Sequence, residues 1–235
     1  MLRKTLKVVV PKSILSRLLI FKQTVTWRLF RLVPSSRLSP IQRYERDGRN
    51  NLLVDGLHID ADSFVWDFGG FVGDYTAAIL ERYTCNVLIF EPVPTFAQIC
   101  QDRFLGNDSV TINPYAVGRV SGERTFHVAG DMSGLFAGGS PNQVNFVSAQ
   151  SVAKEFSHMI SVMKVNIEGG EFELIPALAE AGILQSIGTI LIQFHKVGND
   201  SDAQKAKCTD LLDCTHVLEW EYPWVWEKWI NKNLI

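Results

Sequence analysis

From about residue 50, the chain alternates short apolar runs with longer segments that repeat apolar residues at every third or fourth position. The short runs predict buried strands, and the longer segments predict helices with one apolar face. The predicted strands are 63–68, 87–91, 110–113, 161–166 and 188–194. The predicted helices are 74–83, 94–104, 149–156 and 171–181. This alternation predicts an α/β fold, a doubly wound and mainly parallel sheet with helices on both faces.

Two further stretches depart from this rhythm. The turn signal "GRVSGE" predicts a short polar hairpin over residues 116–129. The C-terminal stretch "THVLEWEYPWVWEKWI" alternates less cleanly, and Pro223 divides it. It predicts two closing strands joined by a turn.

The N-terminal residues 13–33 predict a helix that is apolar nearly all round. Two interpretations stay open. The helix is a basic interfacial one, through which residues 1–33 contact an anionic membrane, or it packs on the domain, over its substrate mouth or in a homo-oligomer contact. The stretch "VPSSRLSP" at 33–40 predicts a linker. Because Lys12 and Arg17 interrupt the apolar stretch, neither a secretory signal nor a bilayer-spanning segment is expected.

Charge is distributed unevenly along the 235 residues. Residues 1–50 hold twelve Lys and Arg against two Asp and Glu, whereas the remaining residues hold eleven against twenty-three. This asymmetry predicts a basic helical extension over 1–50 and an acidic domain over 51–235. Nucleic acid is an unfavourable partner for that domain, because phosphate binding needs a basic surface beside the site.

The four cysteines show no CxxC spacing and no metal-like pairing. This usage predicts a reducing, cytoplasmic compartment, with the membrane-peripheral alternative left open by the N-terminal helix. No cluster of metal-ligand residues stands out along the chain, so no metal is expected.

The stretch "VWDFGGFVGDYTAAIL" at 65–80 runs an apolar strand into a glycine-rich turn and then a helix. Such a turn lets a ligand approach the backbone closely, and the amides at the helix start favour an anionic group. Glu91 ends the next strand, 22 residues after Gly69. An acidic residue at that distance hydrogen-bonds the ribose of nucleotide-like cofactors.

The glycine spacing separates the classes of cofactor. A dinucleotide fingerprint needs glycine where Phe68 stands, and no G-K-[ST] follows to make a P-loop. The remaining pattern, Asp67-x-Gly69-x-x-x-Gly73, resembles the first motif of S-adenosylmethionine-dependent methyltransferases.

Four stretches resemble the FkbM family of O-methyltransferases in order and spacing, over about residues 63–197. They are "DFGGFVGDYT", "IFEPVPTFAQ", "VMKVNIEGGEFELI" and "ILIQFHK". The resemblance implies a Rossmann-like methyltransferase fold with a seven-stranded sheet and S-adenosylmethionine as cofactor. It also implies methylation of a hydroxyl, often on a sugar or polyketide, so the expected acceptor is a glycan or related small molecule.

Four positions depart from the family pattern. Gly70 and Phe71 replace an Ala and an Asn, Asn166 replaces an Asp, and Gln193 replaces a Glu. The last two changes turn carboxylates into carboxamides, which keep hydrogen bonding but lose negative charge and the capacity to accept a proton. Either those carboxylates act mainly through hydrogen bonds, or this chain differs in substrate or activity.

The candidate catalytic residues follow the predicted strands at their carboxyl ends, where open α/β sheets bind ligands. His195 is the first candidate for the base that accepts the hydroxyl proton, because an unperturbed histidine titrates near working pH. Glu168 is the second, and Lys164 is a third catalytic candidate that could instead pair with a carboxylate. Glu168 and Glu171 could also simply favour the start of the following helix.

The expected cofactor site combines the glycine turn with the ends of neighbouring strands. Asp67 would shape the turn, Tyr75 and Thr76 would lie beside the cofactor's carboxylate, and Asn113 and Ala116 would meet the adenine. The segment 130–139 is expected to form a loop over the substrate. The full set of expected cofactor residues is Asp67, Gly69, Gly70, Gly73, Tyr75, Thr76, Glu91, Pro92, Asn113, Ala116 and Asn166.

Two alternatives to an O-methyltransferase stay open. One is a nicotinamide dehydrogenase, against which Phe68 argues. The other is a methyltransferase-fold scaffold or binding protein with weak or no catalysis, for which Asn166 and Gln193 are the best support.

Overall fold

The computed structural model describes residues 34–128, 140–156 and 158–235. The predicted helix at 13–33 and the predicted loop at 130–139 lie outside these residues. Contacts divide the chain into two units that meet between Arg49 and Asn50, and each is taken by itself. The domain boundary expected at 50/51 stays a prediction.

The first unit contains two short helices in its described part. They are the 3-10 helix η1 (Ser35–Arg37) and the α-helix α2 (Pro40–Asp47). Ser39 caps α2 because its hydroxyl accepts from the amide of Gln42, whose side chain accepts from the amide of Ser39 in return. The predicted linker therefore ends where a capped helix begins.

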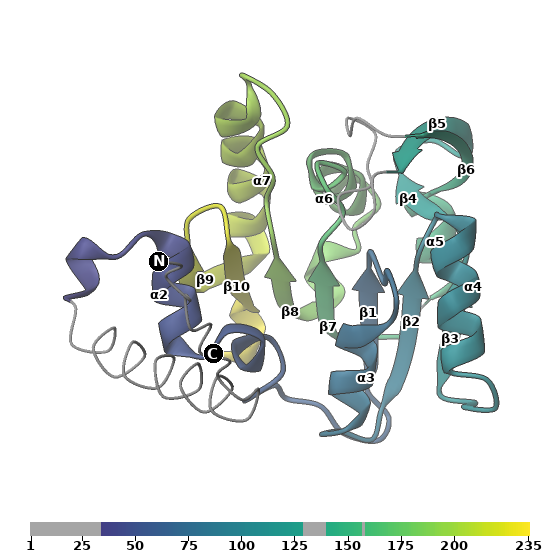
Figure 1. The fold of residues 1–235 in the computed structure, drawn as a ribbon, viewed down its shortest axis with the longest axis horizontal. Coiled ribbons are helices and arrows are strands. Elements are labelled where there is room, and N and C mark those ends of the chain that lie inside the picture. Colours follow the sequence, from purple (N-terminus) through teal and green to yellow (C-terminus); the bar gives the residue numbers. More distant parts are fainter. Residues whose placement is uncertain (1–33, 129–139, 157) are drawn as a thin grey trace, which may run out of the picture. The chain divides into compact units, whose positions relative to one another are not determined.

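The second unit is built on a seven-stranded sheet of order β3-β2-β1-β7-β8-β10-β9 (Figure 1). Its first five strands are parallel, and β10 and β9 close the edge antiparallel. The strands are β1 (Phe64–Phe68), β2 (Asn86–Phe90), β3 (Val110–Asn113), β7 (Ile160–Val165), β8 (Ile187–Ile192), β9 (His216–Tyr222) and β10 (Trp226–Asn231). The predicted doubly wound, mainly parallel α/β fold and its two closing strands are thus confirmed.

Helices precede, connect or follow these strands. They are α3 (Asp74–Leu80), α4 (Pro94–Arg103), α5 (Ala149–Glu155), α6 (Glu171–Glu180) and α7 (Ser201–Thr215), with the 3-10 helices η2 (Arg49–Leu53), η3 (Leu184–Ser186) and η4 (Lys232–Leu234). Among the described residues, no helix is both long and apolar enough to cross a membrane.

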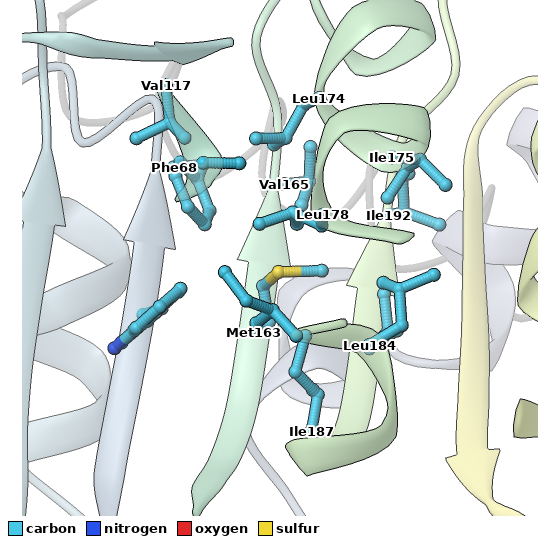
Figure 2. Packing of buried hydrophobic residues seen from close by; sticks show 14 of the residues in the cluster. Phe68, Val117, Met163, Val165, Leu174, Ile175, Leu178, Leu184, Ile187 and Ile192 are labelled. Atoms are coloured by element: carbon cyan, nitrogen blue, oxygen red, sulfur yellow. The ribbon is translucent and has the colours of Figure 1, made fainter. Parts of the chain in front are cut away.

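The main core lies between one face of the sheet and the helices α5 and α6. Figure 2 shows Phe68, Met163 and Val165 of the sheet against Leu174 and Leu178 of α6. Asp67 and Lys164 directly precede Phe68 and Val165, and because side chains alternate along a strand, they point to the opposite face of the sheet. Both are buried on that face, where Asp67 bonds Thr76 of α3.

A second sheet corrects the predicted hairpin. Its strands β4 (Ala116–Gly118), β6 (Ser140–Ser148) and β5 (Gly122–Val128) lie in the order β4-β6-β5. β6 separates the two predicted partners, so the hairpin over 116–129 was wrong. β6 was not predicted because "SPNQVNFVS" opens with polar residues and shows apolar alternation only at its end.

Glu173 fastens this second sheet to α6. Its carboxylate accepts from the guanidinium of Arg124 at 2.7 Å and from the amide of Arg119 at 3.0 Å. The Arg124 guanidinium also lies 4.2 Å from the centre of the Phe146 ring. These charge-assisted bonds lower the pKa of Glu173 despite its burial.

Candidate active site

The glycine turn between β1 and α3 brings two backbones unusually close. A Cβ on Gly69 would lie 2.0 Å from the carbonyl oxygen of Asn166, and one on Gly70 would lie 2.3 Å from Cγ2 of Ile89. Gly69 also has φ +79°, a left-handed value that side chains disfavour. Any side chain at either position would therefore force its neighbours to shift, which favours glycine at both.

Gly73 closes the turn at the start of α3. Its amide donates to the carbonyl of Gly70 at 2.7 Å, and its φ is +82°. A Cβ there would lie 2.7 Å from the Phe104 ring. At both glycines of the predicted motif, Gly69 and Gly73, a side chain would clash with a neighbouring residue.

Glu91 braces the turn from the end of β2. One carboxylate oxygen accepts from the amide of Phe71 at 2.8 Å, and the other accepts from the amide of Val93, just past Pro92, at 2.9 Å. Burial raises the pKa of Glu91 to about 7, although these two amides oppose the shift. Each oxygen keeps a second lone pair with which it could accept a ligand hydroxyl.

Asp67 and Lys164 form a buried ion pair beneath the turn. Lys164 Nζ donates to Asp67 Oδ1 at 2.9 Å and to the carbonyls of Phe68 and Gly69 at 3.3 and 2.8 Å. An ammonium group has three N–H donors, so these three bonds occupy all of them. This arrangement favours a structural role for Lys164 over the expected catalytic one.

Thr76 completes the support of Asp67. Its hydroxyl donates to Asp67 Oδ2 at 2.9 Å, and both residues are fully buried. The structure therefore directs Thr76 to the underside of the turn rather than toward the carboxylate of a cofactor.

Three buried polar atoms at expected cofactor residues have no hydrogen-bond partner among the described residues. They are the Tyr75 hydroxyl, Asn113 Nδ2 and Asn166 Oδ1. Burial, and secondarily the Asp67 charge, raises the pKa of Tyr75 well above its usual range, so its hydroxyl stays neutral. Buried groups of this kind are normally satisfied, and so they point to a ligand or water that supplies their partners.

A cavity of about 260 Å³ lies beside the turn. Gly69, Gly70, Tyr75 and Asn166 line it, together with Trp226 of β10. Two of the three unpartnered polar residues therefore line one cavity, whereas Asn113 lies at the end of β3. Ala116 begins β4 and packs on the small cluster of Val93, Val144 and Phe146.

Phe71 lines this cavity, although it was not among the cofactor residues predicted from the sequence. It has φ +49°, and its ring lies 4.5 Å from that of Phe96. Its position inside the glycine turn, where the family pattern carries asparagine, could have indicated that it lines the site.

His195, which follows β8, lies between the carboxylates of Glu168, which follows β7, and Glu171, the first residue of α6. Its Nε2 is 3.2 Å from Glu168 Oε1, and its Nδ1 is 3.2 Å from Glu171 Oε1. Burial lowers the pKa of His195, but the hydrogen bonds to Glu168 and Glu171 together outweigh it and raise the pKa to about 9. The described residues contain no group of three side chains arranged to hold a metal ion.

The chain resembles solved structures at low sequence identity. A Clostridium thermocellum protein described as an rRNA-methylase has a TM-score of 0.51 and 13% identity, covering 78% of this chain and 94% of its own. An rRNA methylase from Streptococcus thermophilus has a TM-score of 0.47 and 13% identity, covering 83% of this chain and 98% of its own. At such identity the first match shows the methyltransferase fold alone.

Sequence comparison shows the family. No curated protein matches the chain significantly. The model of the methyltransferase FkbM domain, in contrast, matches residues 56–220, which span the glycine turn, Glu91, Asn166 and His195. This chain therefore belongs to the FkbM methyltransferase family.

Proposed function

We propose that this protein is an S-adenosylmethionine-dependent O-methyltransferase that methylates a hydroxyl of a glycan or related small molecule. The observation that carries the proposal is the set of unpartnered buried polar atoms of Tyr75, Asn113 and Asn166, of which Tyr75 and Asn166 line the cavity beside the glycine turn. Membership in a methyltransferase family leaves no support for the nicotinamide dehydrogenase alternative.

The chain's polar groups fit this cofactor. Glu91 would accept from the ribose hydroxyls, since each of its oxygens has used one lone pair on a backbone amide. Asn113 Nδ2 would donate to the adenine ring, and Asn166 Oδ1 would accept from the ammonium group of the methionine part. The cofactor supplies, when bound, an electrophilic methyl group on a sulfonium.

The protein's own contribution to the chemistry is alignment and removal of a proton. Methyl transfer is an in-line displacement, so a fixed geometry provides much of the acceleration. A hydroxyl is a weak nucleophile until its proton leaves, which calls for a base beside it. Glu168 and His195 follow β7 and β8 at the same sheet edge as the turn, and either would reach an acceptor placed there.

Calorimetric titration of S-adenosylhomocysteine tests the cofactor assignment. We expect micromolar binding to the wild type, sharp weakening in Glu91→Ala, and no change in Glu81→Ala, an exposed glutamate in the same unit. A well-folded wild type that binds no S-adenosylhomocysteine would refute the proposal.

A second experiment tests the acceptor. Transfer of a labelled methyl group to a panel of glycans and small hydroxyl compounds should give a product whose new methyl ether is located by mass spectrometry. Cofactor binding without transfer to any hydroxyl would favour the scaffold alternative. The carboxamides Asn166 and Gln193 are the observation behind that alternative, because neither can accept a proton.

A further inference from the structure

A buried carboxylate joins the loops that carry Glu168 and His195. Glu171 is the first residue of α6 and is fully buried. Its Oε2 accepts from the amide of Gly169 at 2.8 Å, and its Oε1 accepts from the amide of His195 at 2.6 Å. Since a buried carboxylate is costly to leave without partners, these bonds hold both loops in one arrangement.

The same carboxylate contacts the His195 ring. Nδ1 of His195 lies at hydrogen-bond distance from Glu171 Oε1, and Nε2 lies at ion-pair distance from Glu168 Oε1, each at 3.2 Å. An ionised carboxylate oxygen only accepts hydrogen bonds, so two carboxylates on opposite sides of the ring favour the form in which both nitrogens carry a proton. In that state the ring has no free lone pair with which to accept another proton.

We propose that Glu171 is a positioning residue that holds both nitrogens of the His195 ring as donors, so that Glu168, and not His195, receives the proton of the acceptor hydroxyl. This inference rests on the proposed function. The acceptor's O–H bond breaks and its proton goes to the Glu168 carboxylate. The freed oxygen pair forms the bond to the methyl carbon, the carbon–sulfur pair stays on sulfur, and His195 keeps both of its protons.

Accessibility and charge agree with this division of roles. The Glu168 side chain is 24% exposed, against 14% for His195 and none for Glu171. Glu168 is thus the member of the trio that an acceptor reaches most easily. The pKa of about 9 for His195 also keeps its ring charged at neutral pH.

Other charged and titratable groups surround the trio. Cys208 of α7 lies with its Sγ 3.9 Å from the carbonyl of Glu171, and burial raises its pKa to about 12, so it stays a neutral thiol. Lys196, next to His195, pairs with Asp202 at 3.4 Å on the surface. Lys205 of α7 lies 5.7 Å from the Phe194 ring and pairs with Glu221 and Glu227. Both lysines are thus paired with carboxylates of their own, and Glu168 and Glu171 are the groups that stabilise the positive charge on His195.

An NMR titration of the histidine rings tests the positioning role without cofactor or acceptor. His195 should titrate near pH 9 in the wild type and about one to three pH units lower in Glu171→Gln, since an opposite charge has been removed. Glu180→Gln, an exposed glutamate on the same helix, should leave His195 unchanged. The buried His216, with a pKa below its usual value, serves as the internal reference.

Kinetics test the base. Glu168→Gln should lower kcat by about 10²- to 10⁴-fold, the usual contribution of general base catalysis, with S-adenosylhomocysteine affinity unchanged. The proposal is overturned if wild-type His195 titrates near 6.5, or if Glu168→Gln keeps full kcat. Should Glu171→Gln fail to fold, those two measurements still decide. If the titration is as expected but the wild type methylates no hydroxyl, the proposed function and the base role fail, while the pairing of Glu171 with His195 stands.

Discussion

Replacing Gly69 by alanine tests whether close backbone approach is what the glycine turn is for. The matched control is Gly106→Ala. Gly106 has φ +80°, almost the same as the +79° of Gly69, but a Cβ there would meet nothing within 4 Å. The two positions therefore share a left-handed φ and differ in the space available for one methyl group.

The expected losses follow from these two features. An alanine held in the left-handed region costs about 1–2 kcal/mol, which both variants should lose. At Gly69 the new Cβ would also lie 2.0 Å from the carbonyl oxygen of Asn166, so β1 and β7 would have to separate where their backbones bond. Overpacking of this kind adds about 1–3 kcal/mol. The total for Gly69→Ala is about 2–5 kcal/mol, a large part of the 5–15 kcal/mol that stabilises a typical domain.

Urea unfolding of the wild type and both variants measures the difference, with unchanged slopes as the check on two-state behaviour. We expect Gly69→Ala to lose about 1–3 kcal/mol more than Gly106→Ala, the overpacking share of the estimate. S-adenosylhomocysteine binding should be abolished in the first and kept in the second. Equal losses in the two variants would show that the 2.0 Å approach relaxes freely and that the steric reasoning is wrong.

Three further outcomes are expected. Because the pKa of Glu91 is about 7 and ribose hydroxyls favour its ionised form, S-adenosylhomocysteine should bind about tenfold more weakly at pH 6 than at pH 8, and Glu91→Gln should remove that dependence in calorimetry. Lys164→Met should lower the free energy of unfolding by about 3–5 kcal/mol because Asp67 stays buried without its partner, and adding Asp67→Asn should recover part of the loss. Glu173→Gln should lose about 1.5–3 kcal/mol through weaker bonds to Arg124, and its lowered pKa means that the wild type's advantage disappears as pH falls below about 4.5.

The central parallel strands could be predicted because they are buried on both faces and mostly apolar. β7 and β8 are almost completely buried, and their sequences are mostly apolar, with Lys164 of β7 as the charged exception. α7 was missed for the opposite reason. Only Ser201, Cys208 and Leu212 are buried among its fifteen residues, and two of these are not strongly apolar, so no helical stripe stands out.

Local sequence determined the glycine turn, the acidic end of β2 and the alternation of the parallel strands with helices α3 to α6. These features depend on residues that are close along the chain, where steric limits and alternation leave a visible pattern. The pairing of β4 with β6 and the trio of Glu168, Glu171 and His195 were decided only by tertiary structure. Glu171 and His195 are 24 residues apart, and their contact exists because parallel pairing of β7 and β8 brings two loop ends to one edge of the sheet. The raised pKa of His195 results from its contacts with Glu168 and Glu171, and the sequence around a histidine does not indicate such contacts.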